Sequence, residues 1–206
     1  MDSDFLPSIW PEESAPEEVV NCRKCELCEQ RTRVIWGEGN PHAPIMLLLD
    51  NPGAREDKDG NQFICGTRQT LQSAAFHAKI KMEDMYITYI LKCRPRRKYN
   101  KEEARGICME HLLRQMAIQQ PKFVFCMGNT SIQWFTGNME ASVKALRGTW
   151  QNIRGIPTLV TYHPLAVRRR PNLTNQFMQD WMLLASRFFS EQEYLLHESV
   201  HGTFFI

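Results

Sequence analysis

The sequence predicts a single α/β domain with a central, mostly parallel four-stranded sheet that is flanked by helices on both faces. Two observations support this fold class. The 206 residues are 43% apolar, which is enough for one core of ordinary size. Four short apolar runs that alternate with helical patterns are typical of buried parallel strands, and they lie at 44–49, 85–91, 122–127 and 156–161.

Helical patterns separate these strands and follow the last one, at about 68–79, 101–119, 129–136 and 174–189. The start of the second helix is the best defined, because Asn100 is a favoured N-cap residue and Glu103 completes a capping box. Outside this body, residues 1–20 are expected to form an acidic flexible tail and residues 190–206 a short acidic appendage. The domain itself is therefore expected to span residues 21–189.

The charge is distributed unevenly along the chain. Residues 1–18 carry six acids and no base, whereas residues 19–189 hold all 25 Lys and Arg against 14 Asp and Glu, a net charge of +11. A basic body of this kind indicates an anionic partner such as nucleic acid, although a well-solvated surface gives the same composition. The longest apolar runs are too short to span a bilayer, and the N-terminus has no signal-peptide pattern, so we expect a cytoplasmic protein.

Seven cysteines in a reducing compartment indicate metal ligands or free thiols rather than disulfides. Cys22 and Cys25 form a C-x-x-C pair, and the distant Cys93 and Cys108 would complete a four-thiolate site. Such a site suits either structural zinc or an iron–sulfur cluster, and the spacing alone does not choose between them. The other cysteines are an extra thiol near the pair, one that follows the first strand and one in an apolar strand that is typical of plain core: Cys28, Cys65 and Cys126.

The loops after the strands contain the most unusual residues, and ligands of such sheets bind at the carboxyl ends of the strands. The turn "DNPG" begins at Asp50 directly after the first strand, and Phe63 offers an aromatic face further along; an ordinary turn is the commoner outcome for such a motif. After the last strand, "TYHPLAVRRRP" places His163 before three arginines. A lone His is usually structural, but one at a strand exit beside arginines is suited to stabilising an anion near phosphates.

These pieces occur in the same order in the iron–sulfur uracil-DNA glycosylases, the family 4 type of the uracil-DNA glycosylase superfamily. "CRKCELCEQRTRVIWGEGNPHAPIMLLLDNPG" resembles the opening of that family, and "EDKDGNQF" and "YITYILKCRPR" resemble its E-D-x-x-G-x-P-F and Y-I-T-N-V-V-K-C-R-P-P segments. "MGN", "RGTW" and "TYHPLAVRRRP" are similar to its later motifs. The resemblance covers about residues 22–188.

The resemblance implies a uracil-DNA glycosylase-like fold, a monomer, a partner DNA with a damaged base, and base excision by flipping of the nucleotide. It implies a structural [4Fe–4S] cluster on Cys22, Cys25, Cys93 and Cys108. It assigns the catalytic roles to Asp50, near the sugar, and His163, at the leaving base. Base contacts would come from Asn51, Phe63 and Tyr89, and DNA contacts from Arg147, Arg168, Arg169 and Arg170.

The motifs depart from the family pattern at the expected base pocket. Leu49 replaces a Gly, Asp50 and Asn51 replace Glu and Ala, and Cys65 replaces another Gly. Tyr89 stands where the family has the Asn that reads uracil, and a phenol does not reproduce the two-point contact of an amide. Two alternatives therefore stay open: a glycosylase for a different modified base, and a catalytically impaired DNA-binding protein. A zinc or redox protein unrelated to DNA would require the ordered motifs to be coincidence.

Overall fold

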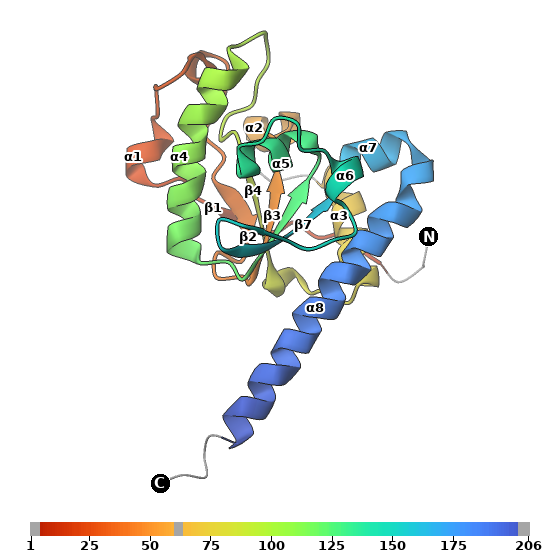
Figure 1. Cartoon of the computed structure of the whole chain (residues 1–206). Helices are drawn as coiled ribbons and strands as arrows, with labels where there is room; N and C mark the ends of the chain where they lie inside the picture. Colours follow the sequence, from red (N-terminus) through yellow and green to blue (C-terminus); the bar gives the residue numbers. More distant parts are fainter. Residues whose placement is uncertain (1–4, 60–63, 202–206) are drawn as a thin grey trace.

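The computed structural model of the chain describes residues 5–59 and 64–201, with the side chains of residues 59 and 195–201 left out. Within these residues, seven strands form one sheet in the order β1-β2-β4-β3-β5-β7-β6 (Figure 1). The strands are β1 (Glu12–Glu13), β2 (Gly37–Gly39), β3 (Ile45–Leu49), β4 (Met85–Tyr89), β5 (Phe123–Met127), β6 (Gln151–Ile153) and β7 (Ile156–Thr161).

The four predicted strands form the middle of this sheet in the order β4-β3-β5-β7, and all three of their pairings are parallel. The α/β fold class and its parallel core are therefore confirmed. The sheet is larger than predicted, because β2 and β6 add antiparallel edges and β1 pairs with β2. These strands are two or three residues long, too short for an alternating hydrophobic pattern to reveal them.

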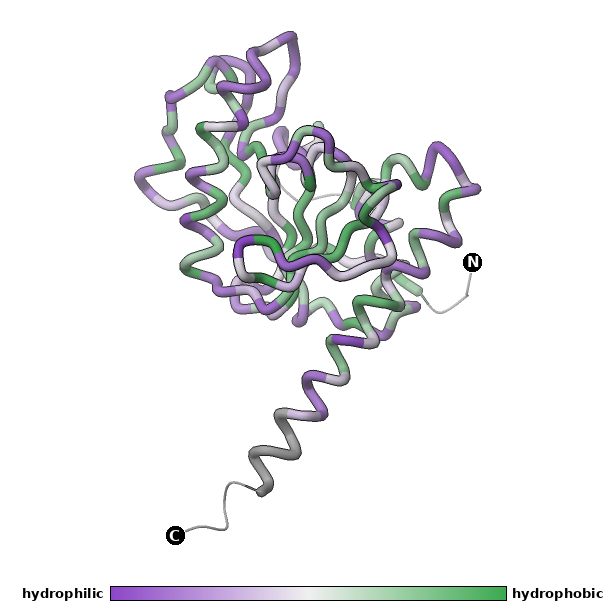
Figure 2. The backbone as a smooth tube through the Cα atoms, viewed as in Figure 1, coloured by the Kyte–Doolittle hydropathy of each residue, from purple (hydrophilic) through white to green (hydrophobic). Residues whose placement is uncertain are grey.

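Helices cover both faces of the sheet, as the alternation predicts. One face packs on α3 (Gly66–His77), α7 (Pro164–Arg169) and α8 (Thr174–His201), through residues such as Leu47, Phe125 and Trp181. The other face packs on α4 (Lys101–Gln119), α5 (Asn129–Thr136) and α6 (Val143–Leu146). Successive strand residues point to opposite faces, and all of β3, β4 and β5 is buried, which explains their continuous apolar runs. Figure 2 shows the hydrophobic residues concentrated on these central strands.

The described part of the segment expected to be a flexible tail packs against the body. Trp10 and Val19 are buried, β1 extends the sheet, and α1 (Glu17–Val20) lies beside α4 in Figure 1. The acids of this segment pair with the basic body: Glu12 with Arg33, and Glu18 with Arg114 of α4. This packing differs from the expected flexible tail because two buried apolar side chains among the acids, Trp10 and Val19, hold the segment against the body.

At the other end of the chain, α8 continues past the predicted helix 174–189 into the expected appendage and projects away from the body (Figure 1). The helical pattern weakens where the helix leaves the core, because exposed residues need no apolar stripe. In the part of the chain that the structure describes, no helix is long and apolar enough to cross a membrane. The division into tail, domain and appendage stays a prediction.

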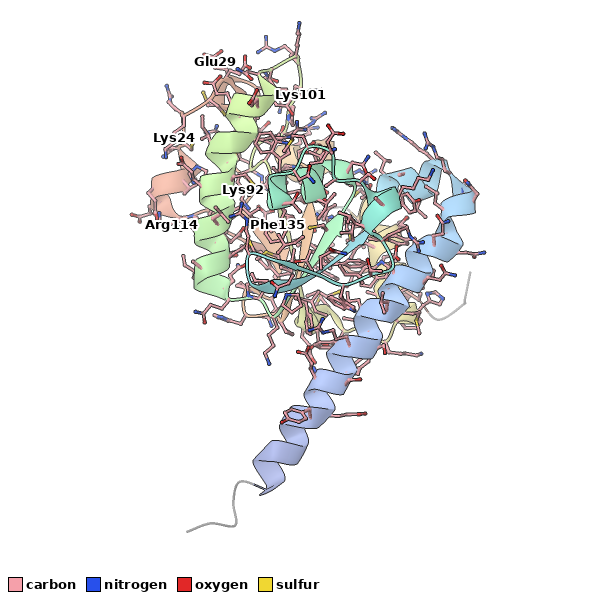
Figure 3. All side chains as sticks on the ribbon, viewed as in Figure 1. Lys24, Glu29, Lys92, Lys101, Arg114 and Phe135 are labelled. Carbon is pink, nitrogen blue, oxygen red and sulfur yellow. The ribbon has the colours of Figure 1, made fainter. Side chains whose placement is uncertain are left out.

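A buried lysine, Lys92, connects the chain after β4 to α4 on the side of the sheet that α4 covers. Lys92 lies between α4 and the sheet (Figure 3), and its Nζ donates to Gln115 Oε1 at 2.7 Å and to the carbonyl of Trp36 at 3.3 Å. It also lies 4.9 Å from the Trp36 ring centroid. Burial lowers the pKa of Lys92 to about 7. Its hydrogen bonds satisfy a polar group that would otherwise destabilise this core.

Candidate active site and metal centre

A cavity of about 540 Å³ opens at the carboxyl ends of the parallel strands. Its lining comes from the chain just after β3, from the end of β4, from the start of α5 after β5, and from the start of α7 after β7. Figure 1 shows α2 (Ala54–Asp59) and α5 near these strand ends. The parallel arrangement therefore brings together loops that are far apart in the sequence, at the edge where such sheets bind ligands.

Asp50 lines this cavity from the first residue after β3. Its carboxylate accepts from Arg105 Nη2 at 3.2 and 3.3 Å, and the side chain is 27% exposed. Burial raises the pKa of Asp50, whereas the Arg105 guanidinium and a hydrogen bond from Thr130 oppose that rise. The ion pair with Arg105 thus favours the ionised form of a partly desolvated carboxylate, which is the form suited to stabilising a nearby positive charge.

His163 lines the same cavity from the exit of β7, where it is the N-cap of α7. Its Nδ1 accepts the backbone N–H of Leu165 at 3.1 Å. Burial, with a smaller contribution from the Arg68 charge, lowers the pKa of His163 to about 4. The ring is therefore neutral at pH 7, and because Nδ1 is an acceptor, the proton is on Nε2. His163 can only donate from Nε2.

Gly128, which follows β5, allows the loop after β5 to lie close to His163 in the loop after β7. Its φ is +99°, and a Cβ there would lie 3.2 Å from the Cβ of His163. The backbone N–H of Gly128 donates to the carbonyl of Thr161 at 2.9 Å, which ties the two loops together. A side chain at this position would strain the backbone and displace the histidine.

A buried charged cluster forms the inner wall of the cavity. The Arg68 guanidinium, from α3, forms an ion pair with Glu38 and lies 3.8 Å from Glu56 Oε1; it also donates to the Tyr89 hydroxyl. Each of these side chains is 9% exposed or less. Burial raises the pKa of Glu38 to about 7 against the opposing pull of Arg68, and it raises the pKa of Tyr89.

The other residues expected at the base pocket, including the positions that depart from the family pattern, lie in different places. Asn51 lines the cavity, and its Nδ2 donates to the carbonyl of Pro52 at 2.9 Å. Cys65 also lines the cavity and its Sγ lies 3.7 Å from Glu56 Oε1. Leu49 lies at the end of β3, opposite Tyr89 in the sheet. Phe63 lies outside the described residues.

The four arginines expected at DNA are placed unequally. Arg147 forms a buried ion pair with Asp180 of α8, at 2.9 and 3.1 Å, and donates to the carbonyl of Gln176. Its side chain is 18% exposed, so these contacts hold the chain before β6 against α8. Arg168 packs over Gly66 at the start of α3. Arg169 and Arg170 are exposed at the end of α7, whose first turn borders the cavity.

The four cysteines expected as ligands gather in a third cluster on the α4 side of the sheet. Cys93 and Cys108 are 4% exposed, and Cys22 and Cys25 pack against the same cluster. Burial raises the pKa of Cys93 to about 12 and that of Cys108 to about 11, and the neighbouring thiols add to both effects. All seven cysteines are free. Cys28 is half-buried near Cys25, and Cys126 is core, as expected for a cysteine in an apolar strand.

The surroundings of these thiols fit an anionic cluster. Arg31 Nη1 lies 3.5 Å from the Cys93 sulfur, while its Nη2 donates to the carbonyl of Cys22 at 2.7 Å. His111 Nε2 lies 3.5 Å from the Cys22 sulfur. No group of three or more His, Cys, Asp or Glu among the described residues converges to hold a single metal ion. A four-iron cluster takes one thiolate per iron, so its sulfur ligands need not converge on one point.

The functional residues that the sequence did not reveal are Arg105, Arg68, Glu38, Glu56 and Thr130. Arg105 is the most informative, because it precedes Cys108 by three residues and therefore shares its face of α4. One helix thus contacts both the cysteine cluster and Asp50. The charges of the two arginines and two glutamates gave no signal in a chain with 25 Lys and Arg and 23 Asp and Glu.

Comparisons with known proteins agree with this arrangement. The sequence model of the Uracil DNA glycosylase superfamily matches residues 36–185, and the chain belongs to this superfamily. Among curated proteins, it is 31% identical over 199 residues to the type-4 uracil-DNA glycosylase of Sulfurisphaera tokodaii, covering 92% of this chain and 90% of that protein. It is 32% identical over 165 residues to the type-4 uracil-DNA glycosylase of Thermotoga maritima, covering 78% and 85% of the two chains.

Proposed function

We propose that this protein is a DNA glycosylase that excises uracil from DNA by hydrolysing the N-glycosidic bond, the first step of base excision repair. The observation that carries the proposal is the pairing, in one cavity, of an ion-paired carboxylate at Asp50 with a neutral Nε2–H donor at His163. The relatives named as type-4 uracil-DNA glycosylases support uracil as the base.

In the proposed reaction, the C1′–N1 bond breaks, the sugar develops oxocarbenium character, and the base departs with the electron pair. His163 Nε2–H donates a hydrogen bond to the carbonyl oxygen of the departing base, where negative charge develops. Asp50 stabilises the sugar cation and orients the water whose hydroxide joins C1′; the remaining proton neutralises the base. Thr130 and Arg105 hold the carboxylate in place.

Cys22, Cys25, Cys93 and Cys108 would hold a [4Fe–4S] cluster, with Cys28 as an extra thiol. When bound, the cluster would supply cross-links between the N-terminal segment, the chain after β4 and α4; we assign it no redox step. The chain's own residues support this role, because Arg31 is placed to compensate thiolate charge. The cluster would also fix α4, and with it the position of Arg105 against Asp50.

The exposed Arg169 and Arg170 at the end of α7 are proposed to contact the DNA backbone beside the cavity, with Arg168 next to them. Arg147 acts instead through its ion pair with Asp180, since its charge is already compensated there. Phe63 is proposed to stack on the flipped base. We further propose that the protein acts as a monomer in the cytoplasm, where its thiols stay reduced.

The test is strand cleavage. Anaerobically purified protein is incubated with oligonucleotides that carry one uracil, single- or double-stranded, and abasic sites are cut with alkali. Uracil strands should be cut, and matched strands with cytosine or thymine should stay intact. An Asp50→Asn variant controls for contaminating activity, because it preserves the size of the side chain and removes its charge. Intact uracil strands with cluster-loaded protein that still binds DNA would disprove the proposal.

A further inference from the structure

The hydroxyl of Tyr89 is fixed in one hydrogen-bonding direction. Arg68 donates to its oxygen, and a guanidinium has no acceptor, so the hydroxyl must direct its own hydrogen elsewhere. Among the described residues, Arg68 is its hydrogen-bonding partner, and burial keeps the phenol protonated by raising its pKa. Because Tyr89 lines the cavity, its hydrogen is available to a molecule bound there.

Arg68 is itself held in place by charge. Its side chain is 5% exposed, it forms an ion pair with Glu38, and Glu56 lies 3.8 Å away. A buried guanidinium that left these carboxylates would leave unpaired charges in the core, which strongly opposes any other placement. A hydroxyl that accepts from a cation is also a stronger donor than a free one.

Asn51 offers a hydrogen-bond acceptor to the same cavity, whereas Tyr89 offers a donor. Its Nδ2 donates to the carbonyl of Pro52 at 2.9 Å, and because a carbonyl only accepts, the orientation of the amide is determined. Its Oδ1 and the second hydrogen of Nδ2 are then left to contact a ligand, and Oδ1 is the acceptor that Asn51 offers to the cavity. The two residues lie at the ends of neighbouring strands, Tyr89 as the last residue of β4 and Asn51 two residues after β3. Leu49 pairs with Tyr89, and the N–H of Leu91 donates to the carbonyl of Asp50 at 2.9 Å.

We propose that Tyr89 and Asn51 together read the edge of the flipped base, and that Arg68 is the positioning residue that makes Tyr89 a donor. This inference rests on the proposed function. Tyr89 donates to a ring carbonyl and Asn51 accepts from the adjacent ring N–H, which in uracil are O4 and N3–H. The donor and acceptor of one amide are thus divided between two residues.

The same arrangement excludes cytosine. Its 4-amino group would face the Tyr89 hydrogen, so a donor would face a donor. Its unprotonated N3 would face Asn51 Oδ1, so an acceptor would face an acceptor. Buried polar groups left unpaired in this way weaken binding far more than the loss of a single hydrogen bond. The site therefore selects bases with a carbonyl beside a ring N–H, which is the edge that deamination of cytosine creates.

The experiment measures binding affinity while each side chain and the edge of the base are changed separately and together, as in a double-mutant cycle. The probes are oligonucleotides with a 2′-fluoro-arabino sugar, whose fluorine opposes the oxocarbenium and prevents excision. One carries uracil, and the other carries 2-pyrimidinone, which lacks both O4 and N3–H. Tyr89→Phe should weaken binding of the uracil probe by about tenfold, the effect of one buried hydrogen bond, and leave binding of the pyrimidinone probe unchanged. Asn51→Leu should also weaken binding of the uracil probe, but it should not weaken binding of the pyrimidinone probe, because the unprotonated N3 of that base would face the Asn51 oxygen.

Arg68 is tested together with its carboxylate partner, so that no buried Glu38 charge is left unpaired. In the double variant Glu38→Gln/Arg68→Met, adding Tyr89→Phe should no longer change binding of the uracil probe, because the hydroxyl is no longer oriented. If Tyr89→Phe weakened binding of both probes equally, Tyr89 would have only a structural role, and the inference would be overturned. Excision of ordinary uracil by the wild type is measured separately, so that failure of the proposed function is distinguished from failure of this inference.

Discussion

His163 has two functions in the structure, and two substitutions separate them. Its Nδ1 caps α7 through Leu165, while its Nε2–H is available to the base. His163→Ala removes both functions. His163→Asn keeps an excellent N-cap oxygen, but the shorter side chain does not reach the position of Nε2.

The expected magnitudes follow from these contacts. Loss of a donor to a developing oxyanion reduces the rate by about 10² to 10³, or about 2.7–4 kcal/mol, and this loss should be the same in both variants. Loss of the cap destabilises the protein by about 1 kcal/mol, and only in His163→Ala. The assay is single-turnover excision of uracil with enzyme in excess, combined with urea unfolding. A rate for His163→Asn within tenfold of the wild type would refute the assigned role.

The pKa of about 4 adds a pH test. The unfolded histidine binds its proton near pH 6.5, and the folded one only near pH 4. The unfolded state therefore binds more protons in this window, and stability falls as the pH drops from 6.5 to 4. The full effect is about 3 kcal/mol at 1.36 kcal/mol per unit. His163→Asn should lack this loss in urea unfolding at pH 7 and pH 4.5, and an identical loss in variant and wild type would contradict the assigned neutral state.

Three further predictions concern the carboxylate, the cysteines and the glycine. Asp50→Asn should lower the excision rate by at least about 10², because the charge that stabilises the sugar cation is lost, with little change in the affinity for abasic-site DNA. Cys93→Ala should lose bound iron and its visible absorption, whereas Cys126→Ala, a core change, should keep both. Gly128→Ala should destabilise the protein by about 1–2 kcal/mol in urea unfolding and slow excision, because a Cβ there meets His163.

The glycine variant has a matched control, and the cysteine and carboxylate variants each have an outcome that would contradict them. Gly137 also has positive φ, at +75°, but a Cβ there meets nothing within 4 Å. Gly137→Ala should therefore cause the strain without slowing excision, and equal slowing in both glycine variants would argue against a contact with His163. Iron retained by Cys93→Ala would remove Cys93 from the ligand set. Asp50→Asn protein that excises uracil at the wild-type rate would exclude the carboxylate from the chemistry.

Much of the scaffold was predictable because its signals are local. The buried parallel strands appear as continuous apolar runs, and the start of α4 at Lys101 is marked by the Asn100 cap, which accepts from the N–H of Glu103 at 3.3 Å. Asp50 and His163 were found for a related reason: the carboxyl ends of parallel strands meet, so residues just beyond them share a cavity. Short edge strands and the docking of the N-terminal segment have no such signal, because they depend on partners that are distant in the sequence.

The sequence by itself determined the fold class, the order of the central elements and the loops that hold the chemistry, since periodicity, capping and strand-end position are properties of short segments. Only the tertiary structure decided what each charge does. Arg147 and Arg169 are alike in the sequence, yet one is compensated by Asp180 and the other is exposed. Arg68 and Arg105 acquire their roles from Glu38 and Asp50, because the energy of a buried charge depends on which opposite charge folding places beside it.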